Sequence, residues 1–276
     1  MTTERNAEPA PEPPEPNADS DPTPASGRVS DSSADASAFL SALRLSDSFL
    51  PVGGYTASYG LEQYINEDRI GDGDDLRELI AAYLRRVVGP CETVALANAH
   101  AASAAGDLEA LLAVDERLHA VTMPREFRES STKAGAKLCE LLAETDTKNG
   151  AEGSDETESD GSDLESAFVD AVAADETPGH YPVAFGVVAQ ARGLSRREAC
   201  LAHAHSFVTG LLGAAQRLGR FGHTEIQSVL AALEPAITAV CERHVDDEPE
   251  AMVSFAPLAE IMGMRHERAG RRLFMS

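Results

Sequence analysis

Apolar side chains recur along most of this chain at intervals of three and four residues, the spacing of one face of an α-helix. The clearest run follows Asp72–Asp75 and consists of Leu76, Leu79, Ile80, Tyr83, Leu84 and Val87. The aspartates before it can accept hydrogen bonds from the free N–H groups of a first helical turn. The pattern therefore predicts an amphipathic helix that begins beside these aspartates.

Other helix starts are marked by capping residues. Asp107 precedes a leucine-rich run, and Pro124 suits the first turn of a helix that continues toward Leu142. Ser195 and Glu198 form the Ser-x-x-Glu capping box of a further helix. Strand-like alternation is scarce and alanine is abundant. The sequence therefore predicts an all-α fold, a single-domain helical bundle of about nine or ten helices.

Two segments lack this helical pattern. Residues 1–36 are acidic and proline-rich with almost no large apolar side chain, and residues 145–163 are acidic and rich in Gly and Ser. Such segments cannot bury enough apolar area to offset the entropy of ordering. We expect a disordered tail at 1–36 and a helical domain at 37–276, interrupted by a disordered insertion at about 145–163.

The charge balance limits the kinds of partner that the protein is expected to bind. The 276-residue chain has 46 acidic and 23 basic residues, a net charge of −23. This excess favours a protein kept soluble in concentrated salt, as in a halophile. It argues against a nucleic-acid partner, because a phosphate backbone needs a basic face. Residues 261–276 are the exception, with four arginines against one glutamate and with Leu273 and Phe274 beside them. Arginine and phenylalanine often anchor interfaces, so we predict a basic docking tail there, with a frayed terminus as the alternative.

The cysteines and the apolar segments indicate a compartment. The four cysteines are isolated, and no apolar segment precedes the acidic N-terminal stretch, so we expect free thiols in the cytoplasm. Ala199–Gln216 contains no Asp, Glu, Lys or Arg, but its polar side chains dilute its hydrophobicity. We expect a buried central helix and no membrane span. Small residues such as Gly210 and Gly213 would let part of it face a second subunit.

Leu45–Glu62 contains the most distinctive turn signals. Pro51 ends any preceding helix, and Gly53 and Gly54 can adopt positive φ before a new helix begins near Ser58. This arrangement predicts a tight helix–turn–helix corner. A phosphate-binding loop is the alternative, although the chain contains no G-x-x-x-x-G-K-[ST] motif.

Candidate catalytic groups are few. His203 and His205 are two positions apart and so would point about 200° apart on a helix, whereas paired metal ligands favour a spacing of three or four. No H-E-x-x-H motif and no Cys/His cluster is present in the sequence. We therefore predict a non-catalytic protein, and assign it no catalytic residue, metal ligand or cofactor. The alternatives are a helical metal-dependent enzyme using His100, His119, His203 or His205, and a self-associating structural protein.

Three well-separated segments resemble the urease accessory protein UreF family. Leu50–Tyr55 (Leu-Pro-Val-Gly-Gly-Tyr) and Ser58–Glu62 (Ser-x-Gly-Leu-Glu) are similar to its N-terminal signature. Arg217–Thr224 resembles its Arg-Leu-x-x-Leu-Gly-Gln-Thr segment. Met264–Glu267 followed by Arg272–Ser276 is similar to its Met-x-His-Glu and Arg-Leu-Phe-Arg-Ser ending. The three matches occur in order at both ends of the chain, which makes the resemblance specific.

The resemblance is weaker elsewhere. Arg125–Gly135 and His180–Gly186 are fainter matches. Ala57 replaces the family's usual Tyr, His223 replaces its Gln, and Met275 replaces its Arg. These departures leave the partner-binding face open.

The resemblance implies a dimeric all-α adaptor for urease maturation. Such a protein would bridge a UreD-type protein (UreH in some systems) and the GTPase UreG on apo-urease, with nickel handled by the partner complex. The implied partner-docking residues are Arg265, His266, Glu267, Arg272, Leu273 and Phe274. The implied structural corner consists of Pro51, Gly53, Gly54, Tyr55, Ser58 and Gly60. The candidate surface for the GTPase or for dimerisation consists of Arg217, Gly222 and His223.

Overall fold

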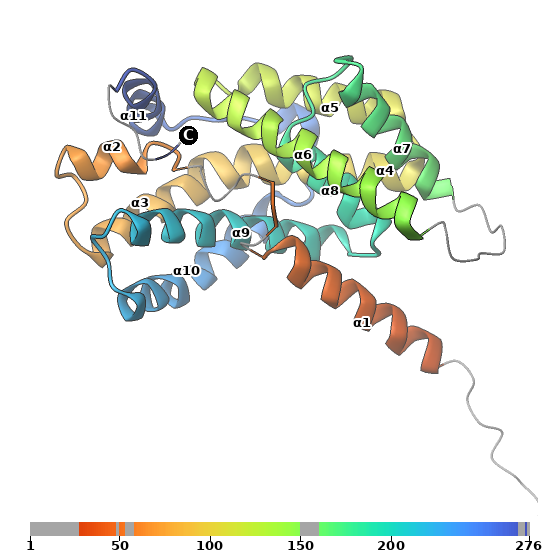
Figure 1. The fold of residues 1–276 in the computed structure, drawn as a ribbon, viewed down its shortest axis with the longest axis horizontal. Coiled ribbons are helices and arrows are strands. Elements are labelled where there is room, and N and C mark those ends of the chain that lie inside the picture. The colour runs from red at the N-terminus through yellow and green to blue at the C-terminus, as the bar shows by residue number, and fades with distance from the viewer. Residues whose placement is uncertain (1–27, 48–49, 53–57, 150–159, 270–273, 275–276) are drawn as a thin grey trace, which may run out of the picture.

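The computed structural model describes residues 28–47, 50–52, 58–149, 160–269 and 274, and this part of the chain is helical without a strand (Figure 1). The all-α prediction is confirmed. In chain order the elements are α1 (Arg28–Leu45), α2 (Leu61–Asn66), α3 (Gly73–Tyr83), η2 (Leu84–Thr93), α4 (Val94–Ala105), α5 (Leu108–Val121), α6 (Arg125–Asn149), α7 (Asp160–Ala173), α8 (Tyr181–Ala191), α9 (Arg196–Arg217), α10 (His223–His244), η3 (Pro249–Ala251) and α11 (Pro257–Glu267).

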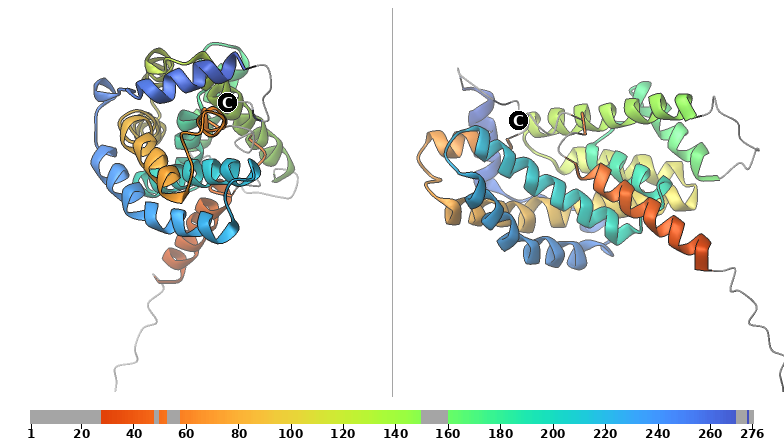
Figure 2. Two further views of the ribbon diagram at one scale, coloured as in Figure 1. Left: turned by 90° about the vertical axis from the view of Figure 1, so that its left-hand side faces the viewer. Right: turned by 60° about the horizontal axis from the view of Figure 1, so that its bottom comes forward.

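The centre of the bundle is α8, which packs against α4, α6 and α9. Its residues from Pro182 to Ala189 are all buried, so it has no polar face to expose. A Cβ atom at Gly186 would lie 2.6 Å from the carbonyl oxygen of Leu96 in α4. The two helices therefore approach to backbone contact. In all three views α1 projects from this body (Figure 2).

The capping residues start helices where the sequence predicts them. The Asp72 carboxylate accepts two backbone N–H bonds at the start of α3, and Asp107 accepts one from Ala110 in α5. Ser195 and Glu198 form both bonds of the capping box at the start of α9. Each side chain replaces a hydrogen bond that a first helical turn cannot make internally.

The helix predicted after Asp72–Asp75 changes geometry part-way. It is an α-helix to Tyr83 and then a π-helix, η2, that contains Pro90. Proline has no N–H group, so Pro90 donates no backbone hydrogen bond to the preceding turn. The carbonyl of Arg86 accepts the N–H of Phe255 at 3.3 Å, and the carbonyl of Pro90 accepts the N–H of Val253 at 3.0 Å. The π-helix therefore binds the backbone of a segment much later in the chain.

Both segments expected to be disordered overlap described helices. α1 begins at Arg28, before the predicted boundary at residue 36, and α6 and α7 extend into residues 145–163 from either side. Once a helix is nucleated and packed, as α6 is through buried Leu138, each further residue adds a hydrogen bond, so the helix extends at little cost. Residues 1–27 and 150–159 lie outside the described part of the chain.

The uncharged Ala199–Gln216 segment forms most of α9. This helix packs against α1, α2, α4, α8, α10 and η2 and buries half of its residues, including Ala204, Val208 and Leu211. It is therefore a central helix, as the sequence predicts. Within the described residues, no helix has the length and apolar character needed to cross a membrane.

Candidate functional site

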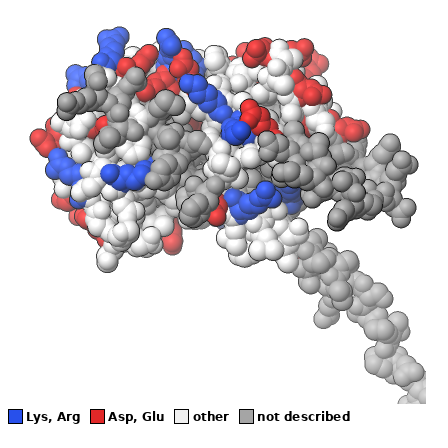
Figure 3. Space-filling view, viewed as in Figure 1, with Lys and Arg blue, Asp and Glu red and all other residues white. Residues whose placement is uncertain are grey.

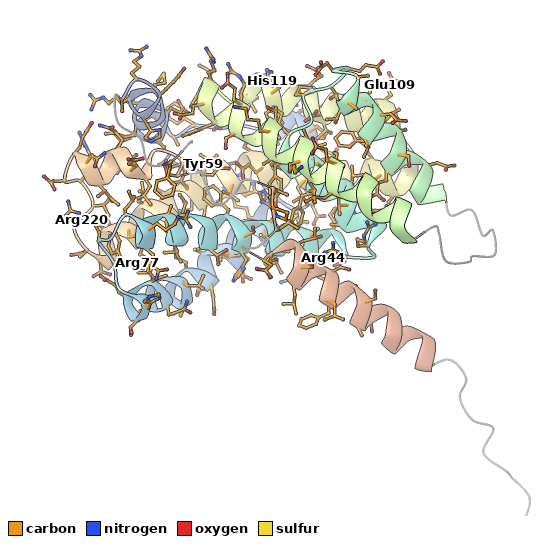
Figure 4. All side chains as sticks on the ribbon, viewed as in Figure 1. Arg44, Tyr59, Arg77, Glu109, His119 and Arg220 are labelled. Atoms are coloured by element: carbon orange, nitrogen blue, oxygen red, sulfur yellow. The ribbon has the colours of Figure 1, made fainter. Side chains whose placement is uncertain are left out.

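The N-terminal corner differs from its prediction in one respect. We expected a helix to begin near Ser58, but α2 begins at Leu61. Tyr59 (φ 47°) and Gly60 (φ 78°) are both left-handed, so neither can belong to a right-handed helix. The Tyr59 ring turns inward, with its centroid 5.0 Å from that of Phe207 (Figure 4). Pro51 is exposed after α1, whereas residues 53–57 lie outside the described part of the chain.

Helix α11 is seated directly on this corner through glycines. A Cβ atom at Gly60 would lie 3.1 Å from the backbone nitrogen of Gly263 in α11. A Cβ atom at Gly263 would lie 2.8 Å from the ring of Phe127 in α6. Both contacts are tighter than ordinary van der Waals packing allows. The starts of α2 and α6 therefore form a seat that α11 fits only with glycine at these positions.

A buried charged cluster joins the same three helices. Nε2 of His266 lies 3.1 Å from Glu62 Oε2, and Nδ1 lies 3.2 Å from Glu126 Oε1. All three residues are buried, and His266 is only 1% exposed. Burial alone would lower the pKa of His266, but the hydrogen bonds and charges of the two carboxylates outweigh burial and raise it. The geometry therefore favours a positively charged imidazolium between two carboxylates.

The C-terminus reaches this cluster as well. Phe274 is buried and donates its backbone N–H to Glu62 Oε2 at 3.2 Å. The guanidinium carbon of Arg217, in the last turn of α9, lies 5.0 Å from the centroid of the Phe274 ring. This distance allows a cation–π interaction. Arg217 therefore connects the α9–α10 turn to the C-terminal end.

An ion-pair cluster lies at the rim of the junction. Arg265 Nη1 lies 2.9 Å from Glu67 Oε1, and Arg69 Nε lies 3.0 Å from Glu67 Oε2. Hydrogen bonds from Gln63, Arg69 and Arg265 lower the pKa of Glu67 to about 2. Because these groups are largely solvated, the pairs orient α11 but add little stability. Basic and acidic side chains lie close together at this end of the molecule (Figure 3).

The outward side of this region is apolar. We call Val253, Phe255, Leu258, Ile261 and Met264 the outer face; each is between 41% and 63% exposed. The last three recur every third residue and so share one side of α11. Two hydrogen bonds hold residues 253–255, the segment before α11, against η2. Val253 N–H donates to the carbonyl of Pro90 at 3.0 Å, and Phe255 N–H donates to the carbonyl of Arg86. An exposed apolar surface on a well-held backbone is typical of a protein interface.

Sequence reasoning did not single out the outer face, and two of the predicted docking residues lie inside the chain. His266 and Phe274 make contacts inside the chain, so in this structure they hold α11 in place rather than present themselves to a partner. Arg265 is exposed, and Arg272 and Leu273 lie outside the described residues. The signal for the outer face was present as apolar residues at 258, 261 and 264, on the side of α11 opposite its buried residues.

The candidate residues of the α9–α10 turn separate into two groups. Arg217 faces the chain's own Phe274, whereas Gly222 and His223 are exposed at the start of α10. Nδ1 of His223 lies 2.6 Å from the side-chain nitrogen of Gln216. This turn therefore offers a small polar surface beyond the half-buried Arg217.

The histidines of the metal-enzyme alternative are dispersed. His119 of α5 lies 3.0 Å from buried His180, and His119 is well separated from Tyr59 (Figure 4). His203 lies 3.7 Å from Glu92 in the interior, and His100 bonds the carbonyl of Leu194. Within the described part of the chain, no group of three or more His, Cys, Asp or Glu could hold a metal ion.

Comparison with known proteins decides the family. Residues 70–234 match the UreF family model. The chain is 34% identical over 240 residues to the urease accessory protein UreF of Trichodesmium erythraeum, covering 87% of this chain and 97% of that protein. The chain belongs to the UreF family. It is also 30% identical over 237 residues to urease accessory protein UreF 1 of Brucella melitensis, covering 86% and 92% of the two chains.

UreF membership makes this protein a urease accessory protein rather than an enzyme. The segments that resemble the family meet at the α11 junction. Ser58–Glu62 supplies Gly60 and Glu62, Met264–Glu267 supplies His266, and Arg217–Thr224 supplies Arg217. Residues far apart in the sequence therefore build one site, which we call the C-terminal module: the outer face, α11 and the charged cluster beneath it.

Proposed function

We propose that this UreF-family protein is a non-catalytic adaptor that bridges a UreD/UreH-type protein and the GTPase UreG on apo-urease. It would support GTP-dependent nickel insertion, with nickel carried by the partner complex. The observation that carries the proposal is the outer face, where apolar side chains lie exposed on a firmly seated helix. Family membership supports the link to urease.

We assign the outer face to the UreD-type partner. Its apolar residues adjoin Arg265, so a partner could combine burial of apolar area with directed bonds to a guanidinium group. The exposed turn at Gly222 and His223 is the surface we assign to UreG or to a second copy. Two separate surfaces are what a bridging protein needs.

The proposal includes a homodimer in the cytoplasm. Among the described residues, a Cβ atom at Gly210 would meet nothing within 4 Å, so this side of α9 could receive another helix. All four cysteines are free and buried, as is common in a reducing compartment. Light scattering over a range of concentrations tests the dimer, and a monomer mass throughout would contradict it.

The function is tested by reconstitution. Urease subunits, a UreD-type protein and UreG would be co-expressed with the wild-type chain, with Ile261→Asp or without the chain, and urease activity and nickel content measured. We expect high activity and nickel content only with the wild type. Equal activation without the chain would overturn the adaptor role, and equal activation by Ile261→Asp would overturn the assignment of the outer face.

A further inference from the structure

Helix α11 is joined to α2 and α6 by a histidine enclosed between two carboxylates. We infer that Glu62, His266 and Glu126 form a pH-sensitive latch, which holds α11 against α2 and α6 near neutral pH and releases it in alkaline solution. The latch determines whether the outer face is presented.

The hydrogen-bond geometry requires a charged imidazole. Both ring nitrogens of His266 face carboxylate oxygens, at 3.1 Å from Glu62 and 3.2 Å from Glu126. An ionised carboxylate can only accept a hydrogen bond, so each ring nitrogen must donate one. A neutral imidazole has a single N–H and can satisfy only one side. The latch is therefore complete only with the protonated ring.

Deprotonation of His266 replaces one of its two hydrogen bonds to carboxylates with a repulsive contact. The unprotonated nitrogen would place a lone pair against a buried carboxylate, and both carboxylates would lose the positive charge between them. Removing one partner from a buried charge cluster is strongly destabilising, because the remaining charges stay desolvated. The carboxylates belong to α2 and α6 and the histidine to α11, so movement of α11 into water relieves the conflict.

The pH response of the latch depends on the charged groups that surround His266. Facing the imidazole are Glu62 of α2 and Glu126 of α6, and Glu62 also accepts the N–H of Phe274. Among the described residues, the junction also holds charged groups that interact at its rim or with the Phe274 ring: Arg265 with Glu67, Arg69 with Glu67, Arg125 with Glu129 and Glu267, and Arg217 with Phe274. The rim pairs are exposed and screened, so the pH response should arise from the buried group.

The direction of the response follows from linkage. The pKa of His266 in the folded chain is raised above its ordinary value of about 6.5. The stability that the latch supplies is therefore complete below about pH 6.5 and is lost as the pH rises through the raised pKa. Because α11 carries part of the outer face, the consequence for partner binding rests on the proposed function. The latch itself does not.

Hydrogen exchange on the isolated chain tests the latch without any partner. Protection of α11 amides, corrected for the intrinsic rate, would be measured at pH 6.0 and 9.0, with α8 as an internal reference. In the wild type we expect at least a tenfold loss of protection in α11 and an unchanged α8. Equal protection of α11 at both pH values, or the same loss in α8, would overturn the proposal.

Three variants identify the group responsible. In Glu62→Gln the amide can pair with a neutral imidazole, so the pH response should disappear. In His266→Gln no group titrates, so α11 should be loose already at pH 6.0 and equally loose at pH 9.0. Glu67→Gln alters only the rim between the same helices and should keep the wild-type response. A wild-type response in Glu62→Gln or in His266→Gln, or its loss in Glu67→Gln, would overturn the assignment.

Discussion

The interior around α8 and the junction beneath α11 both rely on a glycine at a close helix contact, Gly186 in one and Gly263 in the other. They differ in how they hold histidine. Burial lowers the pKa of His203 to about 4 and that of His180 to about 3, so these interior rings are neutral. His266 at the junction lies between two carboxylates that raise its pKa. The same residue type is therefore neutral in one region and charged in the other.

The protonation state of histidine distinguishes the interior around α8, which we call the scaffold, from the C-terminal module. The interior packs around histidines that are held neutral, whereas the seat of α11 depends on a protonated histidine. The two regions should therefore respond to opposite changes of pH. Changes in the interior should affect the whole fold, and changes at the junction should affect α11 and partner binding.

The largest expected effect comes from the interior. Phe185 is fully buried in α8, and Phe185→Ala should lower the free energy of unfolding by about 3–5 kcal/mol because it leaves a cavity. Chemical denaturation measures this loss. Phe255→Ala is the matched control, since Phe255 is 63% exposed, and it should stay within about 0.5 kcal/mol of the wild type. Similar losses in the two variants would contradict the distinction between scaffold and surface.

A matched pair of glycine substitutions examines the seat of α11. Gly263→Ala places a methyl group against Phe127. It should lower the free energy of unfolding by about 1–3 kcal/mol and should also weaken partner binding. Gly210→Ala in α9 meets no described residue within 4 Å and should be neutral or stabilising by up to about 1 kcal/mol. Thermal unfolding and a pull-down with the UreD-type protein report both effects. Wild-type stability and binding in Gly263→Ala would show that the seat is not tight.

The interior should lose stability in acid. Unfolded histidines take up protons below about pH 6.5, but His203 and His180 resist this in the folded chain, so stability falls from about pH 6.5 toward pH 4. Glu92 acts in the opposite direction because burial raises its pKa to about 7. His203→Gln should reduce the loss between pH 6.5 and 5.0 by about 1–2 kcal/mol, measured by urea unfolding. An unchanged pH profile would show that His203 is not held neutral.

The smallest expected effect is at the rim. Arg265→Gln removes the exposed ion pair with Glu67 and should leave the free energy of unfolding unchanged within error. Differential scanning calorimetry at low and high salt provides the check. A large loss at low salt that vanishes at high salt would mean that the rim, rather than the buried cluster, holds α11.

Local signals in the sequence predicted the helices well, because capping bonds connect residues only two or three positions apart. Asp72, Asp107 and Ser195 are examples. The π-helix at Pro90 and the late start of α2 were missed, since both depend on backbone geometry that tertiary contacts stabilise. α1 begins at Arg28, ahead of the predicted boundary at residue 36, because composition does not reveal where a helix begins.

The site was only partly predictable. Family resemblance pointed to the C-terminal segment and to Glu62, but no periodicity indicates that Glu62, Glu126 and His266 meet. Their contact depends on how three helices pack. The resemblance also could not show that His266 and Phe274 face inward. Truncation after Gly263 would consequently disturb the buried cluster as well as any docking surface, so a single exposed substitution is the cleaner probe.

The most direct test is the affinity for a UreD-type protein, measured by calorimetry with wild type, Ile261→Asp and Leu40→Asp. Both substitutions place a carboxylate at an exposed apolar position, one on α11 and the other on projecting α1 (Figure 1). We predict at least a tenfold loss of affinity for Ile261→Asp, about 1.4 kcal/mol or more, and wild-type affinity for Leu40→Asp. Wild-type affinity in Ile261→Asp, or an equal loss in both variants, would contradict the assignment of the outer face.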